Sequence, residues 1–431
     1  MARSLAHHVP PHARITLALS GGLDSIVLLH VLTVLRTRHP FELQAIHVNH
    51  GLSPHASEWA DFCAQYCQAQ CVALGVHHVT IAPQDPAGIE GAARRERHRI
   101  FALQDADYLL TAHHQNDQAE TLLLQLLRGA GPKGLSAMAE IQPHSDWRAA
   151  QLRPLLAFSR AELHRYAVAH ALAWVEDESN LDLRYRRNAL RQQVIPLLEA
   201  HFPATTITLA RAARLQAESA ELLDDLAQLD ASTAIRGDRL DCTALAALSV
   251  ARARNLLRYF IGTHGWSMPN SRRLDEALHQ LLDARQAATV CVNLGEVALH
   301  RFRGGAYLVP RRIWAPQPAL VWRGELSLTL ESIGAEVRFT PVQGAGLKRE
   351  LLDAGKVELR LREGQEKIRL IIGGPHRKLK NLLQESAIPP WERDRLPLLV
   401  CDGQLVWAAG IGLHADCLAG PGDVGIMLSV V

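Results

Sequence analysis

The chain has 431 residues, of which 48% are apolar and 21% charged, a composition typical of soluble globular proteins with two to four domains of this length. The net charge is only +2, so a nucleic-acid surface would have to come from local clusters of basic residues. No apolar run approaches the ~20 residues that a membrane span needs, and no signal-peptide core is present. Seven cysteines, an odd number, argue against a disulfide framework. We therefore expect a cytoplasmic protein with no membrane contact.

A phosphate-binding loop is predicted in the run SGGLDS, where the first strand meets the first helix. This run follows the apolar, β-prone segment 15–19 and precedes an apolar helical segment that starts at Ile26. N–H groups at the start of a helix attract anions, and two adjacent glycines let a phosphate come close. The loop lacks the Walker A lysine, and it resembles the pyrophosphate motif of the N-type ATP pyrophosphatases. The candidate ATP and pyrophosphate residues are Ser20, Gly21, Gly22, Leu23, Asp24 and Ser25, with Asp24 as the candidate Mg²⁺ ligand.

Strand and helix patterns alternate along the first ~130 residues. We expect strands at 43–48, 77–82 and 108–112 and helices at 56–74, 91–104 and 118–127. Apolar strands that alternate with helices predict an α/β fold with a doubly wound parallel sheet. Ligands of such sheets bind at the carboxyl ends of the strands, so three loops are expected to matter. These loops are 20–25, 49–54 and 113–117.

Two carboxylates near the start of the helix at 118 are candidate catalytic residues. Asp117 and Glu120 are three residues apart, so they share one face of that helix. Such a pair can bind Mg²⁺, grip an amino group or accept its proton. Acidic residues in a first helical turn also simply favour the helix dipole. The adjacent pair His113-His114 and the position on the ligand edge of the sheet favour a functional role.

A short basic helix offers a second anion site. The run 91–99 holds four arginines against one glutamate. Arg94 and Arg97 are the candidates for binding pyrophosphate or RNA phosphate, because one guanidinium group can donate two hydrogen bonds to the oxygens of a phosphate. A solvated helix face is the alternative interpretation.

Two further runs leave alternatives open. The run from His47 to Leu52, HVNHGL, can contact adenine or ribose, or it can serve ordinary loop capping. Cys63, Cys67 and Cys71 recur every four residues along one helix face. A buried stripe of small side chains is favoured there over a metal site.

The residues around these candidates resemble one family. The run from Leu110 to Leu124, LTAHHQNDQAETLLL, looks like the signature of the tRNA(Ile)-lysidine synthetases, as do the run HVNHGL and the arginine helix. The pattern continues at Arg128-Gly129, Gly134-Leu135, Arg153–Leu156, Arg160, Glu162-Leu163, Trp174–Asp177, Ser179-Asn180, Tyr185, Arg187-Asn188 and Arg191. The resemblance covers most of residues 14–200. Asn116 departs from it, because many members carry a second aspartate there.

The rest of the chain is predicted to form two further domains. Helical patterns dominate residues 206–318, and the prolines of 310–318 predict a linker. Residues 326–431 alternate like a small β domain, in which 360–380 holds seven Lys or Arg and two Glu, a local net of +5. Clustered cations beside Trp391 suit an RNA backbone with a stacked base, and a core position for Trp391 is the alternative. The run from His376 onward resembles the C-terminal domain of the longer members of the same family.

The resemblance implies an ATP-dependent ligase built from a catalytic domain (1–205), a mainly helical tRNA-contacting domain (206–318) and a small basic C-terminal α+β domain (326–431). Its implied substrate is the wobble cytidine C34 of the isoleucine tRNA with a CAU anticodon. ATP adenylates the C2 oxygen of that base with release of pyrophosphate. The ε-amine of free L-lysine then displaces AMP and yields lysidine.

The same resemblance implies the roles of individual residues. Asp24 would bind Mg²⁺, while Asp117 and Glu120 would position the ammonium group of lysine, a metal or both. RNA or nucleotide phosphates are assigned to Arg94, Arg97, Arg187, Asn188, Arg191, Arg377, Lys378 and Lys380. A homodimer is as compatible with the pattern as a monomer.

Two rival interpretations are a tRNA thiolase of the same fold and a non-catalytic tRNA-binding protein. Thiolases usually need a persulfide cysteine, a CxxC pair or an iron–sulfur site, and the cysteine spacing offers no convincing one. The intact SGGLDS loop together with Asp117 and Glu120 argues against the non-catalytic alternative.

Overall fold

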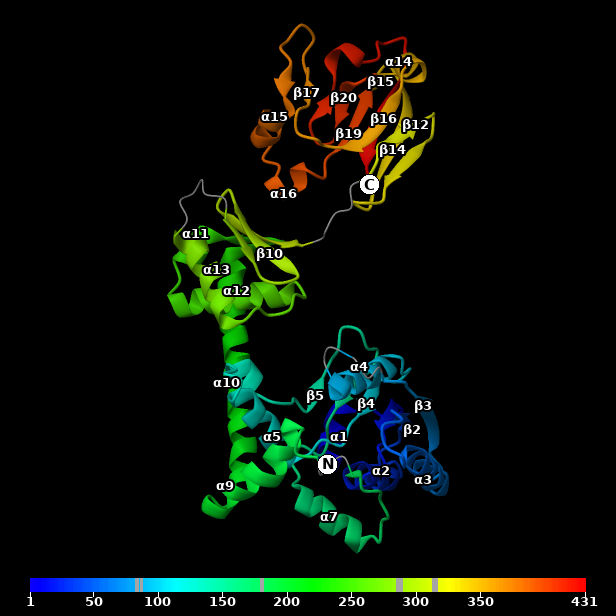
Figure 1. Ribbon diagram of the computed structural model, residues 1–431, viewed down its shortest axis with the longest axis vertical. Coiled ribbons are helices and arrows are strands. Elements are labelled where there is room, and N and C mark those ends of the chain that lie inside the picture. Colours follow the sequence, from blue (N-terminus) through cyan, green and yellow to red (C-terminus); the bar gives the residue numbers. More distant parts are fainter. Residues whose placement is uncertain (82–84, 86–87, 179–181, 284–289, 312–316) are drawn as a thin grey trace. The chain divides into compact units, whose positions relative to one another are not determined.

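The structure is a computed structural model that describes residues 1–81, 85, 88–178, 182–283, 290–311 and 317–431. The chain forms two compact units, Met1–Asp225 and Leu226–Val431 (Figure 1). The predicted division at 205, 318 and 326 is finer than this and stays a prediction. Most of the predicted linker, residues 312–316, and the pair Ser179-Asn180 lie outside the described residues.

The first unit holds one sheet and ten helices among its described residues. The strands are β1 (Arg14–Ala18), β2 (Glu42–Asn49), β3 (Ala73–His78), β4 (Tyr108–Leu110), β5 (Ile141–Gln142) and β6 (Ala150–Leu152). The helices are α1 (Ala2–His8), α2 (Leu23–Leu35), α3 (Ala56–Ala69), α4 (Gly88–Ala102), α5 (Gln115–Leu126), α6 (Pro132–Leu135), α7 (Arg160–Ala169), α8 (Arg186–Ala189), α9 (Ile195–His201) and α10 (Thr205–Ala234). A π-helical turn, η2 (Leu190–Val194), joins α8 to α9, and α10 continues into the second unit.

The sheet confirms the predicted doubly wound α/β fold. Its strand order is β3-β2-β1-β4-β6-β5, and all neighbours pair in parallel except β5 with β6. The chain leaves β1 toward β2 and returns to its other side at β4, so the strand order reverses between β1 and β4. Ligands of such sheets bind at this reversal, outside the carboxyl ends of the strands. The loops after β1 and β4 therefore frame the candidate site.

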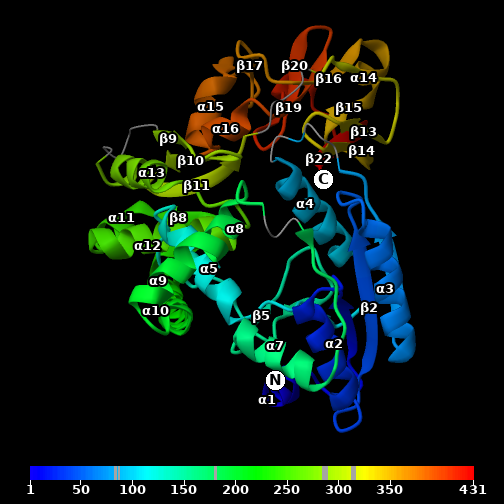
Figure 2. The ribbon, with the colours of Figure 1, turned by 60° about the horizontal axis from the view of Figure 1, so that its bottom comes forward.

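Alternate side chains of the strands fill two cores on opposite faces of the sheet. Leu17 and Leu110 belong to the larger core, with residues of α1, α2, α3 and α7. Ile46 and Leu109 face the other way and pack with Phe101 of α4. Helix α7 lies beside α2 in both ribbon views (Figures 1 and 2). Successive residues of a strand point to opposite faces, which is why neighbours such as Leu109 and Leu110 divide between the two cores.

Two predicted boundaries were wrong. The third strand was expected at 77–82 but lies at Ala73–His78, because α3 ends at Ala69 and Cys71 turns the chain with a φ of 51°. The helix expected from 118 starts at Gln115, because the Asp117 carboxylate accepts from the backbone N–H of His114, the residue before the helix, at 2.9 Å. Both shifts arise from turn and cap geometry that periodicity does not report.

The second unit contains mainly antiparallel sheets with short helices. Its strands are β7 (Ile235–Arg236), β8 (Arg239–Asp241), β9 (Val290–Asn293), β10 (Val297–Phe302), β11 (Gly305–Pro310), β12 (Leu320–Trp322), β13 (Ser327–Leu330), β14 (Ala335–Gln343), β15 (Leu347–Lys348), β16 (Val357–Leu361), β17 (Lys367–Ile368), β18 (Arg377–Lys378), β19 (Pro397–Cys401), β20 (Gln404–Ala408), β21 (Gly412–Leu413) and β22 (Val424–Val430). Its helices are α11 (Cys242–Ala246), α12 (Val250–Thr263), α13 (Ser271–Asp283), α14 (Arg349–Ala354), α15 (Leu379–Glu385), α16 (Pro390–Arg393) and the 3₁₀ turn η3 (Ala415–Cys417).

Two separate cores hold this unit together. Helices α11 to α13 pack on the sheet β7-β8-β11-β10-β9 around residues such as Phe260. The sheets β12-β16-β19-β20-β21 and β13-β14-β22-β15 share a second core that contains Leu359 and Phe339. Among the described residues, none of the helices has the length and apolar character that crossing a bilayer requires.

Candidate functional site

The predicted phosphate loop forms a tight, hydroxyl-lined turn at the start of α2. The two serine hydroxyls, Ser20 Oγ and Ser25 Oγ, lie 3.1 Å apart. Ser20 Oγ also accepts from the N–H of Gly22 at 3.3 Å, and Ser25 Oγ donates to the carbonyl oxygen of Gly22 at 3.0 Å. Gly22 and Leu23 start α2, so the N–H groups of the first helical turn point to the same place. The loop therefore presents the donors that a phosphate group needs.

Gly21 is required by both conformation and space. Its φ is 86°, a left-handed value that side chains rarely adopt. A Cβ atom there would lie 3.0 Å from Cys63 Sγ and 3.0 Å from Val175 Cγ2. The carbonyl oxygen of Gly21 also accepts from the N–H of Val175 at 3.0 Å, so a segment more than 150 residues later holds the loop. That contact gives a structural reason for the Trp174–Asp177 run of the family pattern.

Asp24 joins this loop to the loop after β4. Its Oδ2 lies 3.5 Å from Nε2 of His114, a histidine that is 2% exposed. The same Nε2 lies 3.5 Å from Asp117 Oδ2, whose carboxylate also accepts from the His114 backbone N–H at 2.9 Å. His114 therefore sits between two carboxylates from different strands' loops. Sequence reasoning singled out the histidine pair but did not identify this bridging position.

The carboxylates Asp117 and Glu120 lie together, as predicted, and both contact arginines. Arg187 Nε donates to Glu120 at 2.6 Å and its Nη2 donates to Asp117 at 2.8 Å. Arg191 Nε donates to the other oxygen of Glu120 at 2.6 Å, and its Nη2 reaches both carboxylates at 3.0 and 3.3 Å. Glu120 is completely buried. The spacing of Arg187 and Arg191, four residues, puts both guanidinium groups on one helical face.

These contacts set the ionisation of the site. Burial acts to lower the pKa of His114, but Asp24, Asp117 and Glu120 outweigh it and raise that pKa. Burial acts to raise the pKa of Asp117, but the charges of His114 and Arg187 hold it below its usual value. Burial lowers the pKa of His113, which therefore stays neutral near pH 7. The site thus combines an Asp117 carboxyl of lowered pKa with a His114 imidazole of raised pKa, beside two arginines.

Asp24 is the carboxylate that suits Mg²⁺ best. Its Oδ1 is buried and has no hydrogen-bond partner among the described residues. By contrast, Asp117 and Glu120 already accept several donors from Arg187 and Arg191. Magnesium in nucleotide sites is usually held by one or two carboxylates together with substrate phosphates. The donor set therefore fits a Mg²⁺ ion, which Asp24 would hold beside bound phosphates.

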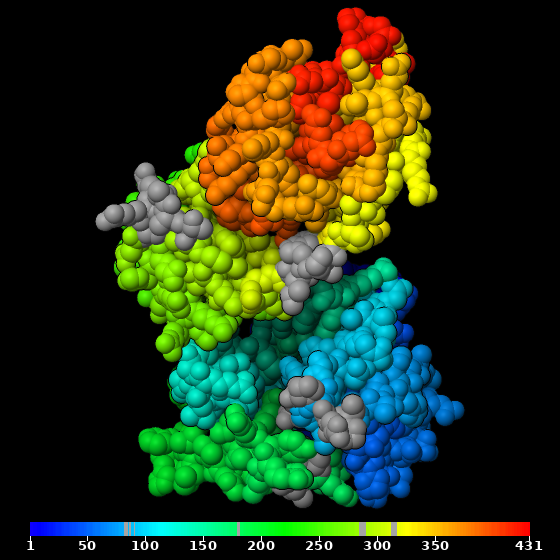
Figure 3. Space-filling model, turned by 45° about the horizontal axis from the view of Figure 1, so that its top comes forward, coloured from blue at the N-terminus to red at the C-terminus, as the bar shows by residue number. Residues whose placement is uncertain are grey.

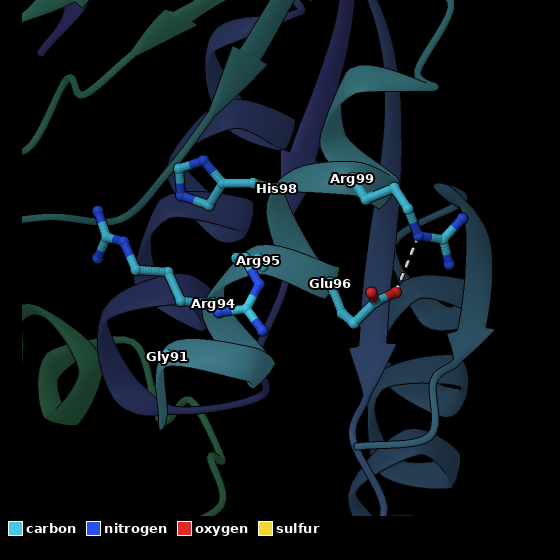
Figure 4. Close-up of a pocket in the computed structure, with 6 residues that line it drawn as sticks. All are labelled: Gly91, Arg94, Arg95, Glu96, His98 and Arg99. Carbon is cyan, nitrogen blue, oxygen red and sulfur yellow. Dashed lines mark hydrogen bonds and ion pairs between the residues drawn. The ribbon is translucent and has the colours of Figure 1, made fainter. Parts of the chain in front are cut away.

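The basic helix α4 lines a shallow cavity of about 500 Å³. Arg94 and His98 project from one side of α4, whereas Arg99 and its partner Glu96 lie on another (Figure 4). Arg95 pairs with Asp85. Burial lowers the pKa of His98 to about 4, with Arg94 and Arg97 adding to the shift, so this histidine is neutral at pH 7. The cavity wall thus contains the exposed guanidinium groups of Arg94, Arg95 and Arg99, as a phosphate site requires, whereas Arg97 is exposed on the same helix outside this lining. The phosphate role of Arg94 and Arg97 stays a prediction.

The HVNHGL run contains structural hydrogen bonds. His47 Nδ1 lies 2.9 Å from the carbonyl oxygen of Leu19 and ties β2 to the end of β1. Asn49 accepts from the N–H of Gly51 at 2.8 Å and donates to the carbonyl oxygen of Ala56 at 3.1 Å. The loop-capping alternative therefore accounts for Asn49.

The cysteine stripe is buried only in part. Cys63 and Cys67 are at most 1% exposed, and burial raises their thiol pKa to about 12 and about 11. Cys71 was expected on the same face, but it lies beyond the end of α3 and is exposed. Protonated core thiols are poor metal ligands and poor nucleophiles.

The basic residues near the C-terminus lie in the second unit. Arg377, Lys378 and Lys380 are exposed, and Arg377 pairs with Glu385. Trp391 packs against the rings of His300 and Tyr307, with centroids 4.8 and 5.4 Å away. Trp391 is half-buried and belongs to neither core of its unit, so its RNA-stacking role stays a prediction.

Asn188, Arg187 and Arg191, which were predicted to bind phosphates, and Asn116, which departs from the family pattern, all contact parts of their own unit. Asn188 donates to the carbonyl oxygen of Asp182 at 3.0 Å, and the departing residue Asn116 accepts from the N–H of Arg160 at 3.0 Å. Arg187 and Arg191 were assigned to phosphates, and the structure places both on carboxylates. Sequence spacing did not show this pairing, because the partners are about 70 residues apart. Their phosphate role stays a prediction.

Comparison with known proteins gives full-length matches. Residues 1–198 match the PP-loop domain, residues 240–307 the TilS substrate binding domain and residues 357–430 the TilS substrate C-terminal domain. The tRNA(Ile)-lysidine synthase of Nitrosomonas europaea is 41% identical over 430 residues, which cover 99% of this chain and 93% of that protein. The enzyme of the same name from Aromatoleum aromaticum is 44% identical over 425 residues, which cover 98% and 99%.

Solved structures show weaker similarity. A U34-tRNA thiolase, NcsA from Methanococcus maripaludis, is 20% identical with a TM-score of 0.43, and the match covers 50% of this chain and 76% of that one. A crystal structure of a TilS C-terminal domain is 22% identical with a TM-score of 0.21, and the match covers 26% of this chain and 96% of that domain. The sequence matches are decisive, because they run through all three matched domains at about 40% identity. The chain therefore belongs to the tRNA(Ile)-lysidine synthase family.

Proposed function

We propose that this protein joins lysine to the wobble cytidine of the isoleucine tRNA with a CAU anticodon, at the expense of ATP. The observation that carries the proposal is the meeting of two loops where the strand order reverses. One loop offers hydroxyl and N–H donors to phosphates, and the other brings Asp117 and Glu120. Full-length similarity to enzymes named tRNA(Ile)-lysidine synthase supports the assignment.

The first half-reaction activates the base. The C2 oxygen of cytosine is a poor leaving group, and attack on the α-phosphate of ATP converts it into an adenylate that can leave as AMP. The loop Ser20–Ser25 holds the β- and γ-phosphates that depart as pyrophosphate. A Mg²⁺ ion held by Asp24 would neutralise charge on those phosphates. His114 keeps the Asp24 carboxylate oriented toward the loop.

The second half-reaction needs a lysine with an uncharged ε-amine at C2. Asp117 and Glu120 are the carboxylates placed to attract the ammonium group and to take its proton. Both are saturated by Arg187 and Arg191, so lysine must share these carboxylates with the two guanidinium groups or displace them. The target base must also leave its stack, which costs least in a flexible anticodon loop.

The test is incubation of the protein with ATP, radiolabelled lysine and transcripts of the isoleucine tRNA with a CAU anticodon. We expect label in the RNA only when ATP is present, and none in methionine tRNAs with the same anticodon. Omission of lysine should leave an AMP-modified RNA that accepts lysine when it is added later. Labelling without ATP, or transfer of sulfur in place of lysine, would contradict the proposal.

A further inference from the structure

The second unit carries an exposed apolar tip on a small two-stranded ribbon. Strands β17 and β18 pair antiparallel, with Lys367 opposite Lys378, and the ribbon lies next to α15 (Figure 1). The connection holds Ile371 and Ile372, which are 74% and 76% exposed. Residues around 367–385, orange in Figure 3, form part of the visible surface of this unit. Two adjacent exposed isoleucines at one tip make a concentrated apolar surface that calls for an explanation.

The tip is held by the fold on both sides. At the base of the ribbon, Ile368 is fully buried in the core and Leu370 packs against that core. The N–H of Gly374 donates to the carbonyl oxygen of Ile371 at 2.9 Å, and Gly373 has a φ of 71°. This is the geometry of a tight turn with glycine at its third position. The exposure of the two isoleucines is therefore set by a defined turn.

The ribbon is strongly basic and poorly neutralised. Residues 367–380 contain five Lys or Arg and no Asp or Glu. Arg369 pairs with Asp416 and Arg377 with Glu385, but no described carboxylate forms a salt bridge with Lys367, Lys378 or Lys380. Like charges directly opposite each other destabilise a strand pair, and an isolated two-stranded ribbon is only marginally stable. A polyanion bound between the lysines would remove that repulsion.

One ligand chemistry satisfies both the cations and the apolar tip. The apolar surfaces of RNA are the faces of its bases, which are covered within a helix and exposed at helix ends and in unpaired nucleotides. Each exposed base is attached to a sugar that carries at least one phosphate. Isoleucine side chains are among those that wedge against bases in nucleic-acid complexes.

We propose that Ile371 and Ile372 pack on an exposed base face of the tRNA substrate, while Lys367 and Lys378 bind the phosphates beside it. This rests on the proposed function for the identity of the RNA. The two isoleucines would add an apolar contact that does not depend on salt, whereas the lysines alone would bind RNA only through electrostatic attraction. The contact positions the RNA and takes no part in chemistry.

The test compares tRNA binding by two variants over a range of salt concentrations. Ile371→Ser with Ile372→Ser should weaken binding about tenfold, because the apolar surface that the two side chains bury against the base is lost, and should leave the salt slope unchanged. Lys367→Ala with Lys378→Ala should instead reduce the slope by about 1 to 2, because fewer phosphate contacts release fewer counterions. The matched control is Leu326→Ser, a similarly exposed leucine (73%) outside the ribbon, which should bind like the parent protein.

Other outcomes would overturn the proposal. Unchanged binding by the isoleucine variant would do so, as would a change in the salt slope in place of the affinity. So would loss of dimerisation or of binding to anionic vesicles with intact tRNA binding, since the tip would then serve a second copy or a lipid surface. Thermal melting of each variant verifies that the ribbon substitutions leave the second unit folded.

The same preparations separate this inference from the proposed function. If the parent protein transfers no lysine to the tRNA, the proposed function fails, whatever the tip does. If transfer occurs, the isoleucine variant should lower kcat/KM for tRNA with kcat unchanged at saturating tRNA. A transcript trimmed of its unpaired 3′ nucleotides identifies the base: an equal affinity of variant and parent for it assigns the contact to the 3′ end, and a persistent difference assigns it to a loop.

Discussion

At the scale of single residues, Asp24 differs from the other carboxylates of the site because its Oδ1 is buried without a protein partner. Replacement by asparagine keeps the shape and removes the charge. We expect Asp24→Asn to lower tRNA-dependent ATP–pyrophosphate exchange by about 100-fold or more, as loss of one stabilising group at a reacting phosphate does. Asp61→Asn, on an exposed position of α3, is the control and should exchange normally. Normal exchange by Asp24→Asn would remove Asp24 from the reaction.

Glu120 should contribute more to the stability of the fold than Asp24, because it is fully buried and accepts hydrogen bonds from two arginines. Glu120→Gln would leave both guanidinium groups short of a counter-charge. Breaking a buried ion pair costs about 3–5 kcal/mol, and the 29% exposure of each arginine side chain reduces that to about 2 kcal/mol here. We expect a melting temperature lower by several degrees in calorimetry, whereas the exposed Glu58→Gln should melt like the parent. An unchanged melting temperature would contradict the buried pairing.

His114 should make stability depend on pH in a defined direction. Its pKa is raised in the folded protein by Asp24, Asp117 and Glu120, which outweigh burial. A histidine whose pKa is higher in the folded than in the unfolded protein stabilises the fold when it is protonated. This stabilisation is fully present below the pKa of the unfolded protein, about 6.5, and is lost as the pH rises through the pKa of the folded protein. His114→Asn should therefore cost more stability at pH 6 than at pH 9, measured by urea unfolding at both values. An equal loss at the two pH values would show that the imidazole carries no charge there.

The chemistry of these residues was more predictable than their pairing. Asp24, Asp117 and Glu120 could be brought together from sequence because each follows a strand of one parallel sheet. The partners Arg187 and Arg191 could not, since they come from a helix that begins well after the sheet ends. Arg187 and Arg191 were assigned to phosphates because they are arginines, and the structure shows them paired with carboxylates. The identity of a residue does not tell in which direction its side chain points.

At the scale of elements, the loop between β1 and α2 depends on the unequal roles of its two glycines. Gly21 has a φ of 86° and no room for a Cβ, whereas a Cβ at Gly22 would meet its nearest atom, Ser20 Oγ, at 3.5 Å. We expect Gly21→Ala to lower stability by about 1–2 kcal/mol through backbone conformation alone, with a further loss from the contacts at 3.0 Å. The free energy of unfolding of Gly22→Ala should lie within about 0.5 kcal/mol of the value for the parent protein. Similar losses of stability in the two variants would mean that the loop backbone adjusts equally well to a side chain at either position.

Element types were easier to predict than element ends. The alternation of apolar strands and helices predicted the doubly wound sheet, because burial on both faces leaves a strong pattern. The true position of β3 depended on Cys71 turning the chain, and the start of α5 depended on the hydrogen bond from the His114 N–H to Asp117. The small sheets of the second unit were least predictable, because a two-residue strand such as β15 is defined by a pairing partner far along the chain.

At the scale of the whole molecule, binding and chemistry should separate, because the basic residues 377, 378 and 380 belong to a different unit from the carboxylates. Changing Arg377, Lys378 and Lys380 together to alanine should weaken tRNA binding and reduce its salt slope by about 2–3. The KM for lysine should not change. Arg338→Ala, which removes an exposed cation paired with Glu336, is the control and should bind tRNA normally. A changed lysine KM with normal tRNA binding would overturn this division of labour.

The π-helical turn η2 has a consequence that concerns helix phase. Pro196, in α9, has no N–H to give to the carbonyl four residues earlier, and the chain accommodates one extra residue in the turn before it. Because this wide turn takes up the extra residue locally, the segments on either side of it keep their helical phase, and Arg187 stays beside Glu120. Deletion of one exposed residue of the turn, Gln193, should therefore lower the melting temperature less than deletion of one residue from the middle of α10, where no wide turn takes up a rotation of about 100°.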